Sequence, residues 1–349
     1  MEAYTVGVSP LRVLLVDDSP SVRAVVRRFL TADASIELVG EAPDGEAAVE
    51  AAARLRPDVI VMDLQMPVLD GLVAIERIMA ARPVPIIVLS SRANRNLAQT
   101  AFEAMRRGAL EVLPKPEDTD SWRELATSLP RVLHGVTRSV DMRPRNGRTA
   151  VRAPLVASGR LRWVVVGAST GGPVALRDLF AELPRNAPVS LFVVQHIAPG
   201  FEPGLAEWLG RSCELDVGIA TDGEQPAPGT ARICPPNVHL RLAPGGVLQL
   251  DAATPPRRSH RPAVDELFLS AATASPRETA GVLLTGMGAD GAEGLLALRQ
   301  AGGLTMVQDE ASCAVFGMPR VALERQAADL ALAPAEIGRA LRQTWEHGG

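Results

Sequence analysis

The chain has 349 residues, of which 47% are hydrophobic and 22% are charged, and its formal net charge is -4. This composition is ordinary for a soluble globular protein with room for two domains, and its lack of overall basic character argues against nucleic acid as a partner. No apolar run reaches the roughly 20 residues of a membrane span and the N-terminus lacks the apolar core of a secretory signal, so we expect no membrane insertion.

Three cysteines, Cys213, Cys234 and Cys313, show neither CxxC pairing nor the spacing of metal ligands. We expect reduced, mostly buried thiols, which is the usual state of cysteine in the cytosol. The sequence therefore predicts a cytoplasmic protein.

Strand and helix patterns alternate regularly through the first part of the chain, after a short flexible lead at residues 1–10. Strands are predicted at 12–16, 37–40, 59–62, 85–89 and 111–113, and helices near 21–30, 45–55, 72–80, 96–107 and 121–133. Right-handed crossovers between such units give a parallel sheet with helices on both faces. Residues 11–133 are therefore predicted to form a (βα)5 domain.

Charged and hydroxyl side chains follow four of these five strands. Asp17 and Asp18 follow the first, Asp63 the third, Ser90 ends the fourth and Lys115 follows the fifth. The carboxyl ends of parallel strands share one edge, so these side chains should converge. Crowded carboxylates persist most easily around a hard cation such as Mg²⁺, and the hydroxyl and ammonium groups suit a phosphoryl group on Asp63. A rim of solvated loop charges is the alternative, and so many matching strand ends argue against it.

Residues 134–160 interrupt the pattern, because they combine many arginines with little apolar periodicity. The arginines are Arg138, Arg143, Arg145, Arg148, Arg152 and Arg160. We interpret the segment as a flexible basic linker. The alternative is a docking segment for an anionic partner.

A second βα series begins at residue 161 and is predicted to form a domain over 161–349, mostly parallel, with short antiparallel strands or hairpins in the irregular stretch 213–262. Its first strand runs into Gly167-Ala168-Ser169-Thr170-Gly171-Gly172, and a helical pattern follows. Gly-x-Ser-x-Gly between a strand and a helix is the spacing of a nucleophile elbow. A phosphate-binding loop and a plain tight turn are the alternatives that the motif leaves open.

Two further side chains complete a possible set for acyl transfer. His196 follows the predicted strand 190–195, and Asp290 lies in the loop after the predicted strand 280–284. Both would share a sheet edge with Ser169, and a serine, a base and an orienting carboxylate are the groups that nucleophilic catalysis needs. His239 and His260 are rival bases, and Asp309, after the apolar run 304–307, is a rival acid.

The first domain resembles a response-regulator receiver domain. The matching motifs are Val16-Asp17-Asp18-Ser19, Met62-Asp63-Leu64-Gln65-Met66-Pro67-Val68-Leu69-Asp70-Gly71, Ser90-Ser91 and Lys115-Pro116. The resemblance implies that Asp63 is the phosphoacceptor, that Asp17, Asp18 and Asp63 surround Mg²⁺, that Ser90 is the switch hydroxyl, and that Lys115 contacts the phosphate. The phosphodonor would be a histidine kinase.

The second domain resembles the catalytic domain of the chemotaxis protein-glutamate methylesterases. The matching motifs are Gly167 to Pro173, Gln195-His196, Arg261 to Phe268, Leu283 to Gly291 and Gln308 to Pro319. The resemblance implies that Ser169 is the nucleophile, His196 the general base and acid, and Asp290 the orienting acid, and that Thr170 and Met287 line the site. Their backbone N–H groups are candidate oxyanion donors, Met287 the weaker one.

These resemblances imply an α/β protein with two doubly wound domains. The implied activity is removal of methyl groups from γ-glutamyl esters on methyl-accepting chemoreceptors, with glutamine deamidation in some members, and with no cofactor for hydrolysis. We expect the unphosphorylated receiver to shade the Ser169 edge and phosphorylation to shift the packing of the domains. One departure concerns this relay: Val112 stands where such receivers often carry an aromatic residue. The rival functions are a non-enzymatic adaptor and an esterase or deamidase acting on a protein outside chemotaxis.

Overall fold

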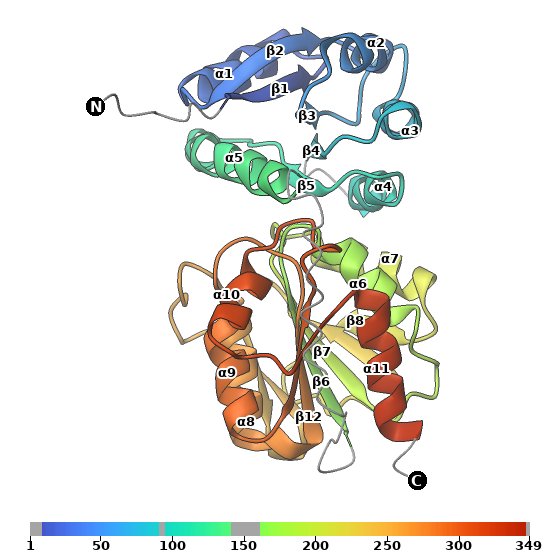
Figure 1. Ribbon diagram of the computed structural model, residues 1–349, viewed down its shortest axis with the longest axis vertical. Helices are drawn as coiled ribbons and strands as arrows, with labels where there is room; N and C mark the ends of the chain where they lie inside the picture. Colours follow the sequence, from blue (N-terminus) through green and yellow to red (C-terminus); the bar gives the residue numbers. More distant parts are fainter. Residues whose placement is uncertain (1–8, 91–94, 141–160, 347–349) are drawn as a thin grey trace, which may run out of the picture. The chain divides into compact units, whose positions relative to one another are not determined.

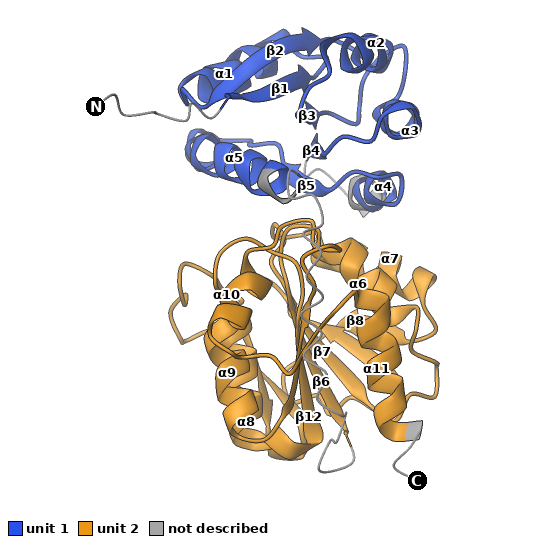
Figure 2. Ribbon diagram, viewed as in Figure 1, with its two compact units in different colours: residues 1–141 blue, residues 142–349 orange. Residues whose placement is uncertain are grey.

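The computed structural model describes residues 9–90, 95–140 and 161–346, and its helices and strands are labelled in Figure 1. Figure 2 shows that the chain divides into two compact units, residues 1–141 and 142–349. Each unit is an α/β fold built on its own sheet. Among the described residues, no helix has both the length and the apolar character needed to cross a bilayer.

The first unit is built on a five-stranded parallel sheet with the strand order β2-β1-β3-β4-β5. The strands are β1 Leu11–Val16, β2 Ile36–Ala42, β3 Val59–Met62, β4 Ile86–Ser90 and β5 Glu111–Pro114. The helices are α1 Pro20–Thr31, α2 Gly45–Leu55, α3 Gly71–Ala81, α4 Arg95–Arg106 and α5 Thr119–Val140. Helices α1 and α5 cover one face, and α2, α3 and α4 the other (Figure 1). The predicted (βα)5 fold is confirmed, with most ends shifted by one or two residues.

Local capping explains where three of these helices begin. Ser19, Asp44 and Asp70 each accept a backbone N–H from the first turn of the helix that follows. Such side chains satisfy N–H groups that have no partner inside the helix. Each of these helices therefore begins at the residue that follows its cap.

Helix α5 is longer than the sequence analysis predicted. It continues to Val140, so the part of the expected linker at residues 134–140 is helical. The reason is packing: Leu129, Leu133 and Val136 are all fully buried and recur at helical spacing on one face. The predicted helix ended near residue 133 because the arginine-rich stretch after it shows little apolar periodicity, but the buried face continues the helix beyond that point. The rest of the expected linker, 141–160, and residues 1–8 of the expected lead lie outside the described residues.

The second unit is built on a seven-stranded parallel sheet with the order β14-β13-β12-β6-β7-β9-β8. These strands are β6 Trp163–Ala168, β7 Ser190–Gln195, β8 Asp216–Ile219, β9 Thr230–Ile233, β12 Thr279–Leu283, β13 Leu304–Gln308 and β14 Leu330–Leu332. The helices are α6 Gly172–Phe180, α7 Glu202–Ser212, α8 Val264–Ala274, α9 Ala292–Gln300, α10 Met318–Glu324 and α11 Pro334–Glu346, with short 3₁₀ turns at Pro244–Gly246 and Pro276–Glu278. Helices α8, α9 and α10 lie on one side of the sheet, and α6, α7 and α11 on the other (Figure 1).

The irregular stretch 213–262 divides into two kinds of structure. Strands β8 and β9 join the edge of the parallel sheet, whereas β10 His239–Ala243 and β11 Val247–Asp251 form an antiparallel hairpin. The prediction of hairpins in this stretch is therefore confirmed for one pair of strands. The hairpin leads into residues 252–263, which return the chain to the start of α8.

Both sheets reverse their winding direction beside the strand with which they start. In the first, β1 lies between β2 and β3, and in the second, β6 lies between β7 and β12. In open parallel sheets, loops diverge at such a switch point and leave a crevice at the carboxyl ends of the strands. In the first unit the predicted aspartates follow β1 and β3, and in the second the predicted serine, histidine and aspartate follow β6, β7 and β12.

Candidate active site

Ser169 lies in a tight turn between β6 and α6. Its N–H donates to the carbonyl of Thr285 (3.0 Å), and its own carbonyl accepts the N–H of Gly172 (2.7 Å). Gly171 has a left-handed backbone, with φ +76°. The predicted strand–turn–helix is confirmed, and the turn is bonded on one side to the loop that follows β12.

The two glycines after Ser169 are required by close packing. A Cβ on Gly171 would lie 2.4 Å from the Cβ of Ala314, in a backbone region that L side chains rarely adopt. A Cβ on Gly172 would lie 2.0 Å from Oε1 of Gln195. Neither position accepts a side chain without displacing its neighbours, so the turn is held in one shape.

His196 lies beside Ser169 at the ends of adjacent strands. Ala168 and Gln195 are paired in the β6–β7 register, and the N–H of His196 donates to the carbonyl of Ala168 (2.9 Å). The buried amide of Gln195 then donates to the carbonyls of both Ser169 (2.8 Å) and His196 (2.9 Å). One side chain thus fixes the two backbone segments relative to each other.

Asp290 reaches the His196 ring from the loop after β12. Nε2 of His196 lies 2.9 Å from Oδ2 of Asp290, and both side chains are largely buried. The oxygen lies off the direction of the ring N–H, so this is an ion-pair approach and not an aligned hydrogen bond. Catalytic hydrogen bonds are often poorly aligned before substrate binds. Nδ1 of the ring is buried without a hydrogen-bond partner among the described residues, which leaves it open to a hydroxyl group.

The carboxylate of Asp290 also closes the N-terminus of α8. It accepts the backbone N–H groups of Val264 (2.8 Å) and Asp265 (3.0 Å), where the N-cap residue Ala263 offers no side-chain acceptor. Burial alone would raise the pKa of Asp290, but the contact with His196 and the two backbone donors outweigh it and hold the pKa below its ordinary value. Asp290 is therefore ionised at neutral pH, as an orienting acid requires.

The two candidate oxyanion donors lie in segments that meet at Ser169. Neither the N–H of Thr170 nor that of Met287 donates a backbone hydrogen bond within the described part of the chain. A Cβ on Gly286 would lie 2.6 Å from the Cβ of Ser169, so the residue before Met287 packs directly against the serine. Both N–H groups are thus available near the turn.

The rival residues have other contacts. His239 is fully buried, accepts the N–H of Ala263 on Nδ1 (3.2 Å) and lies 3.2 Å from the carbonyl oxygen of Pro255 through Nε2. Asp309 accepts the N–H of Ser312 (3.0 Å) and orders its own loop. His260 is the exception, because its ring lies directly against that of His196. Of the two rival bases, only one is brought to the site.

Three polar residues that support this site were given no role by the sequence analysis. Besides Gln195, Thr285 donates its hydroxyl to the carbonyl of Thr170 (2.9 Å) and accepts the N–H of Val315 (2.9 Å). Gln308 in turn accepts the N–H of Thr285 (2.8 Å). Each is buried at or just after the end of a strand. A polar residue in that position of a buried strand is the sequence signal that could have identified them.

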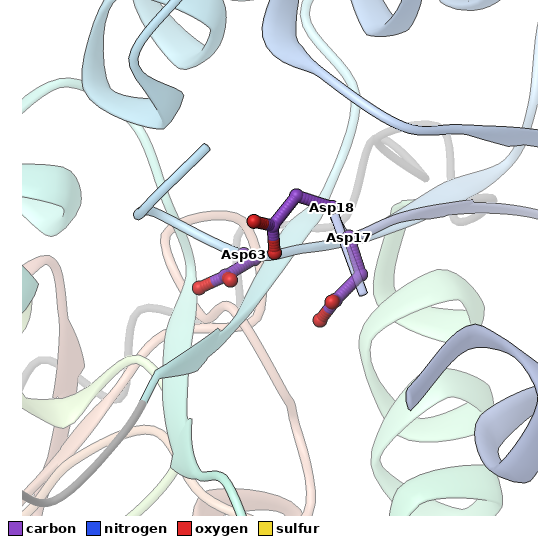
Figure 3. A group of neighbouring side chains, drawn as sticks. All are labelled: Asp17, Asp18 and Asp63. Carbon is purple, nitrogen blue, oxygen red and sulfur yellow. The ribbon is translucent and has the colours of Figure 1, made fainter. Parts of the chain in front are cut away.

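The acidic cluster of the first unit is shown in Figure 3. One carboxylate oxygen from each of Asp17, Asp18 and Asp63 lies within 4.8 Å of the other two. Nζ of Lys115 contacts Asp17 (2.8 Å) and Asp63 (2.5 Å), and Ser90 is buried at the end of β4. All five sequence-predicted residues lie at carboxyl ends of the sheet, as expected.

Negative charge is in excess in this cluster, since one lysine faces three carboxylates. Burial raises the pKa of Asp63, and the nearby Asp17 adds to the rise, although Lys115 opposes it. Burial would lower the pKa of Lys115, but its two carboxylate partners outweigh this and raise it. A lysine shared between two carboxylates neutralises neither fully. A group of oxygen ligands with uncompensated charge fits a hard divalent cation.

Comparisons with known proteins match both units of the chain. The model of the CheB methylesterase family matches residues 164–341, and that of the response regulator receiver domain matches residues 13–127. Protein-glutamate methylesterase/protein-glutamine glutaminase 4 of Geobacter metallireducens is 41% identical over 339 residues, which cover 95% of this chain and 98% of the relative. Protein-glutamate methylesterase/protein-glutamine glutaminase 2 of Anaeromyxobacter dehalogenans is 44% identical over 340 residues, covering 97% and 98%.

Among solved structures, the CheB methylesterase catalytic domain of Thermotoga maritima is 39% identical, with a TM-score of 0.51 over 53% of this chain and 99% of that chain. The relatives align along nearly their whole length, so both units belong to one shared architecture. The chain is therefore a member of the CheB methylesterase family, and its first unit is a response regulator receiver domain.

Proposed function

We propose that the protein is a phosphorylation-regulated serine hydrolase that demethylates glutamyl methyl esters on chemoreceptors, releases methanol and so serves adaptation in chemotaxis. The observation that carries the proposal is the contact of His196 with an ionised, buried Asp290 at the switch point beside Ser169. The names of the full-length relatives support the same substrate chemistry.

The first half of the reaction acylates the serine. Nδ1 of His196 accepts the Ser169 proton as Oγ attacks the γ-carbonyl carbon of the methyl ester. The carbonyl π electrons move to oxygen, and the N–H groups of Thr170 and Met287 stabilise that oxyanion. When the intermediate collapses, His196 returns the proton to the departing methoxy oxygen. Methanol leaves, and a glutamyl ester remains on Ser169.

The second half releases the product. His196 removes a proton from a water molecule as it attacks the same carbonyl carbon, and then protonates Oγ of Ser169 as the ester bond breaks. The glutamate carboxylate is set free. Throughout, Asp290 holds the ring of His196 and stabilises its positive charge without itself taking the proton.

The receiver provides the control element. Asp63 accepts a phosphoryl group from a histidine kinase, with Asp17, Asp18 and Asp63 holding Mg²⁺, which offsets negative charge when it is bound. Lys115 and Ser90 contact the phosphoryl oxygens. The phosphoryl group carries about 1.5 to 2 negative charges and replaces the single charge of the Asp63 carboxylate, so negative charge at this edge increases. We propose that this charge relieves inhibition of the catalytic unit by the receiver, through a relay that works with Val112 in place of an aromatic residue.

The same site can also deamidate glutamine. The two relatives described above carry protein-glutamine glutaminase in their names. Attack of Ser169 on a glutamine side chain gives the same glutamyl ester, with ammonia leaving in place of methanol. Ammonia release from unmethylated receptor that depends on Ser169 tests this activity.

Demethylation is tested with chemoreceptor membranes carrying radiolabelled methyl groups. Wild-type protein is expected to release labelled methanol, and Ser169→Ala is expected to reduce release to the level of membranes alone. Ser212→Ala, at the end of α7, is the matched control and should retain activity. Equal release by wild type and Ser169→Ala would exclude the serine mechanism. No release by either protein would favour a different protein substrate or an adaptor.

A further inference from the structure

A second histidine lies against His196. The rings of His196 and His260 have centroids 4.1 Å apart and an angle of 10° between their planes, which is a face-to-face stack. Resting on the catalytic roles proposed above, we propose that His260 is a positioning residue: its ring, held by an arginine-anchored turn, fixes the plane of the His196 imidazole.

His260 ends a tight turn that begins at Arg257. The turn is closed by two backbone hydrogen bonds, from the N–H of Arg257 to the carbonyl of His260 (3.0 Å) and from the N–H of His260 to the carbonyl of Arg257 (2.9 Å). Arg258 and Ser259, between them, have φ values of 49° and 70°. Residues with side chains are uncommon in this region and persist there only where the surroundings hold them.

Two arginines of the turn attach it to the helices beneath. Arg257 donates to Glu266 of α8 (3.1 Å) and to Glu293 of α9 (2.8 Å). Arg258 donates to the second oxygen of Glu293 (3.2 Å). Glu293 accepts hydrogen bonds from both arginines and so links two consecutive residues of the turn to α9.

The buried carboxylate of Asp265 lies beneath the same turn. Its Oδ1 accepts the N–H of Gly294 in α9 (2.8 Å), while its Oδ2 lies 3.7 Å from Nε of Arg257 and 3.6 Å from Nε of Arg258. That oxygen has no hydrogen-bond partner among the described side chains and backbone groups. The two guanidinium groups therefore compensate its charge at ion-pair distance, which draws the turn toward the helices.

The rest of the 252–263 loop is attached as well. His239 bridges it by accepting the N–H of Ala263 on Nδ1 and contacting the carbonyl of Pro255 through Nε2. Arg261 donates to the carbonyl of Ala252 (3.2 Å). The loop is thus tied at its beginning and its end, and His260 projects from a segment with little freedom.

The two residues that contact the His196 ring, Asp290 and His260, are both held by groups near the N-terminal ends of α8 and α9. Asp290, at the edge of the ring, accepts N–H groups at the start of α8, including that of Asp265. His260, on the face of the ring, is held by arginines that pair with Glu266, Glu293 and Asp265. The contact with Asp290 selects Nε2 as the nitrogen at that edge but leaves the ring free to tilt about the line from Nε2 to Oδ2. A flat partner on the face of the ring removes this tilt. The two contacts together fix the position of Nδ1, the nitrogen that we propose accepts the serine proton.

The test measures the rate at which a fluorophosphonate labels Ser169 in the full-length chain, because labelling needs an activated serine but no receptor. Mg²⁺ and a small phosphodonor are present throughout, so that the proposed inhibition by the receiver is relieved. We expect His260→Ala to slow labelling about 10- to 100-fold, as a small misplacement of a catalytic group does. His260→Phe, which keeps a flat ring without a titrating nitrogen, should restore the rate to within about threefold of wild type. His134→Ala, a histidine of the receiver, is the matched control.

The outcomes distinguish the positioning role of His260 from the assignment of Ser169 as the nucleophile. If His260→Ala is labelled as fast as wild type, the positioning role is overturned, while the assignment of Ser169 as nucleophile stands. Labelling as slow in His260→Phe as in His260→Ala would also overturn it, because a proton-carrying role would then be required. A wild-type protein that is not labelled at all would overturn the assignment of Ser169, and with it the inference. Thermal melts establish that each variant is folded.

A further variant weakens the attachment of the turn that carries His260 without changing His260 itself. Glu293→Gln removes the charge shared by Arg257 and Arg258 without touching either histidine, and should slow labelling about three- to tenfold. Glu324→Gln, in the exposed Arg320–Glu324 pair of α10, is the matched control and should label like wild type. Combining Glu293→Gln with His260→Ala should slow labelling no further than His260→Ala alone, since both act through one stack. Multiplied losses would contradict the inference.

Discussion

Asp290 performs two tasks with one buried carboxylate. It holds the ring of His196 by its edge, and it satisfies two N–H groups at the start of α8. The helix N-terminus and the imidazole both favour the ionised form, which is how a carboxylate remains charged while it is 2% exposed. Its proposed catalytic contribution and its structural contribution are therefore coupled, and substitutions at this position must be chosen to separate them.

Asp290→Asn should remove the proposed catalytic contribution and keep most of the structural one. The amide keeps an oxygen that can still accept a backbone N–H from α8, so the fold should survive, but it cannot stabilise a positively charged His196. We expect the rate of ester hydrolysis to fall on the order of 10³- to 10⁴-fold, the loss typical of such a change in a serine triad. Steady-state kinetics measure it, and a near-native circular dichroism spectrum is the control. Activity within tenfold of wild type would contradict the role.

The lowered pKa of Asp290 also predicts how stability depends on pH. A carboxyl group whose pKa is lower in the folded state contributes stability above its unfolded pKa, about 3.9, and loses that contribution as pH falls through the folded value. The unfolding free energy of the catalytic unit should therefore decline on acidification below about pH 4. Denaturant titrations at several pH values should give a shallower decline for Asp290→Asn. Parallel curves for the two proteins would show that another group is responsible.

Gln195 contributes through the backbone on both sides of the site. Gln195→Ala leaves the carbonyls of Ser169 and His196 without this donor, and a buried acceptor that loses its partner typically costs about 1 to 3 kcal/mol. We expect a loss of unfolding free energy in that range together with reduced activity. Gln249→Ala, on the exposed face of β11, should change neither by a comparable amount. An equal effect of both substitutions would contradict this account.

At the scale of elements, the sequence predicts where strands end, but it does not predict which side chains from other elements cap the helices. The runs of apolar residues before Asp17, Asp63, Ser169 and His196 indicate buried strands, and parallel pairing then places those residues at one edge of each sheet. Nothing near Ala263 or Gly291 in sequence predicts that α8 is capped by Asp290 and α9 by Asp265. These caps come from other elements, so they depend on tertiary packing.

The same distinction explains the error at the end of α5 and the different role that we propose for His260. The arginines after residue 133 and their lack of apolar periodicity suggested a linker, whereas the burial of Leu133 and Val136 continues the helix. His260 was considered as a base, and its stack on His196 follows only from the path of the 252–263 loop. Local patterns predicted the elements and their site residues, and contacts between elements determined the support around them.

A divalent cation that binds the carboxylates in the loops after β1 and β3 should stabilise the receiver. Binding to the folded receiver raises its unfolding free energy by about 2.7 kcal/mol when the free ion is at 100 times its dissociation constant. We expect Mg²⁺ to raise the melting temperature of the receiver transition and Asp18→Asn to reduce the shift. The control is Asp58→Asn, whose carboxylate precedes β3 and accepts the N–H of Arg12. Unchanged melting of wild type in Mg²⁺ would argue against a cation site.

At the scale of the whole molecule, two parallel sheets place candidate site residues in the same way. The proposed site residues of each unit follow strands at a switch point: carboxylates after β1 and β3, and a serine, a histidine and an aspartate after β6, β7 and β12. The fold thus supplies the location and the side chains supply the reaction. The proposed regulation links these edges, with a charge added at Asp63 changing the rate at Ser169.

The most direct test of this link is methanol release from methylated chemoreceptor membranes, measured with and without a small phosphodonor in the presence of Mg²⁺. Wild type, Ser169→Ala and Asp63→Asn are compared at equal concentration. We predict that phosphodonor increases release by wild type, leaves Asp63→Asn at its basal rate, and produces no release with Ser169→Ala. Release that rises equally in wild type and Asp63→Asn, or that continues without Ser169, would contradict the central claim that phosphorylation of Asp63 controls hydrolysis at Ser169.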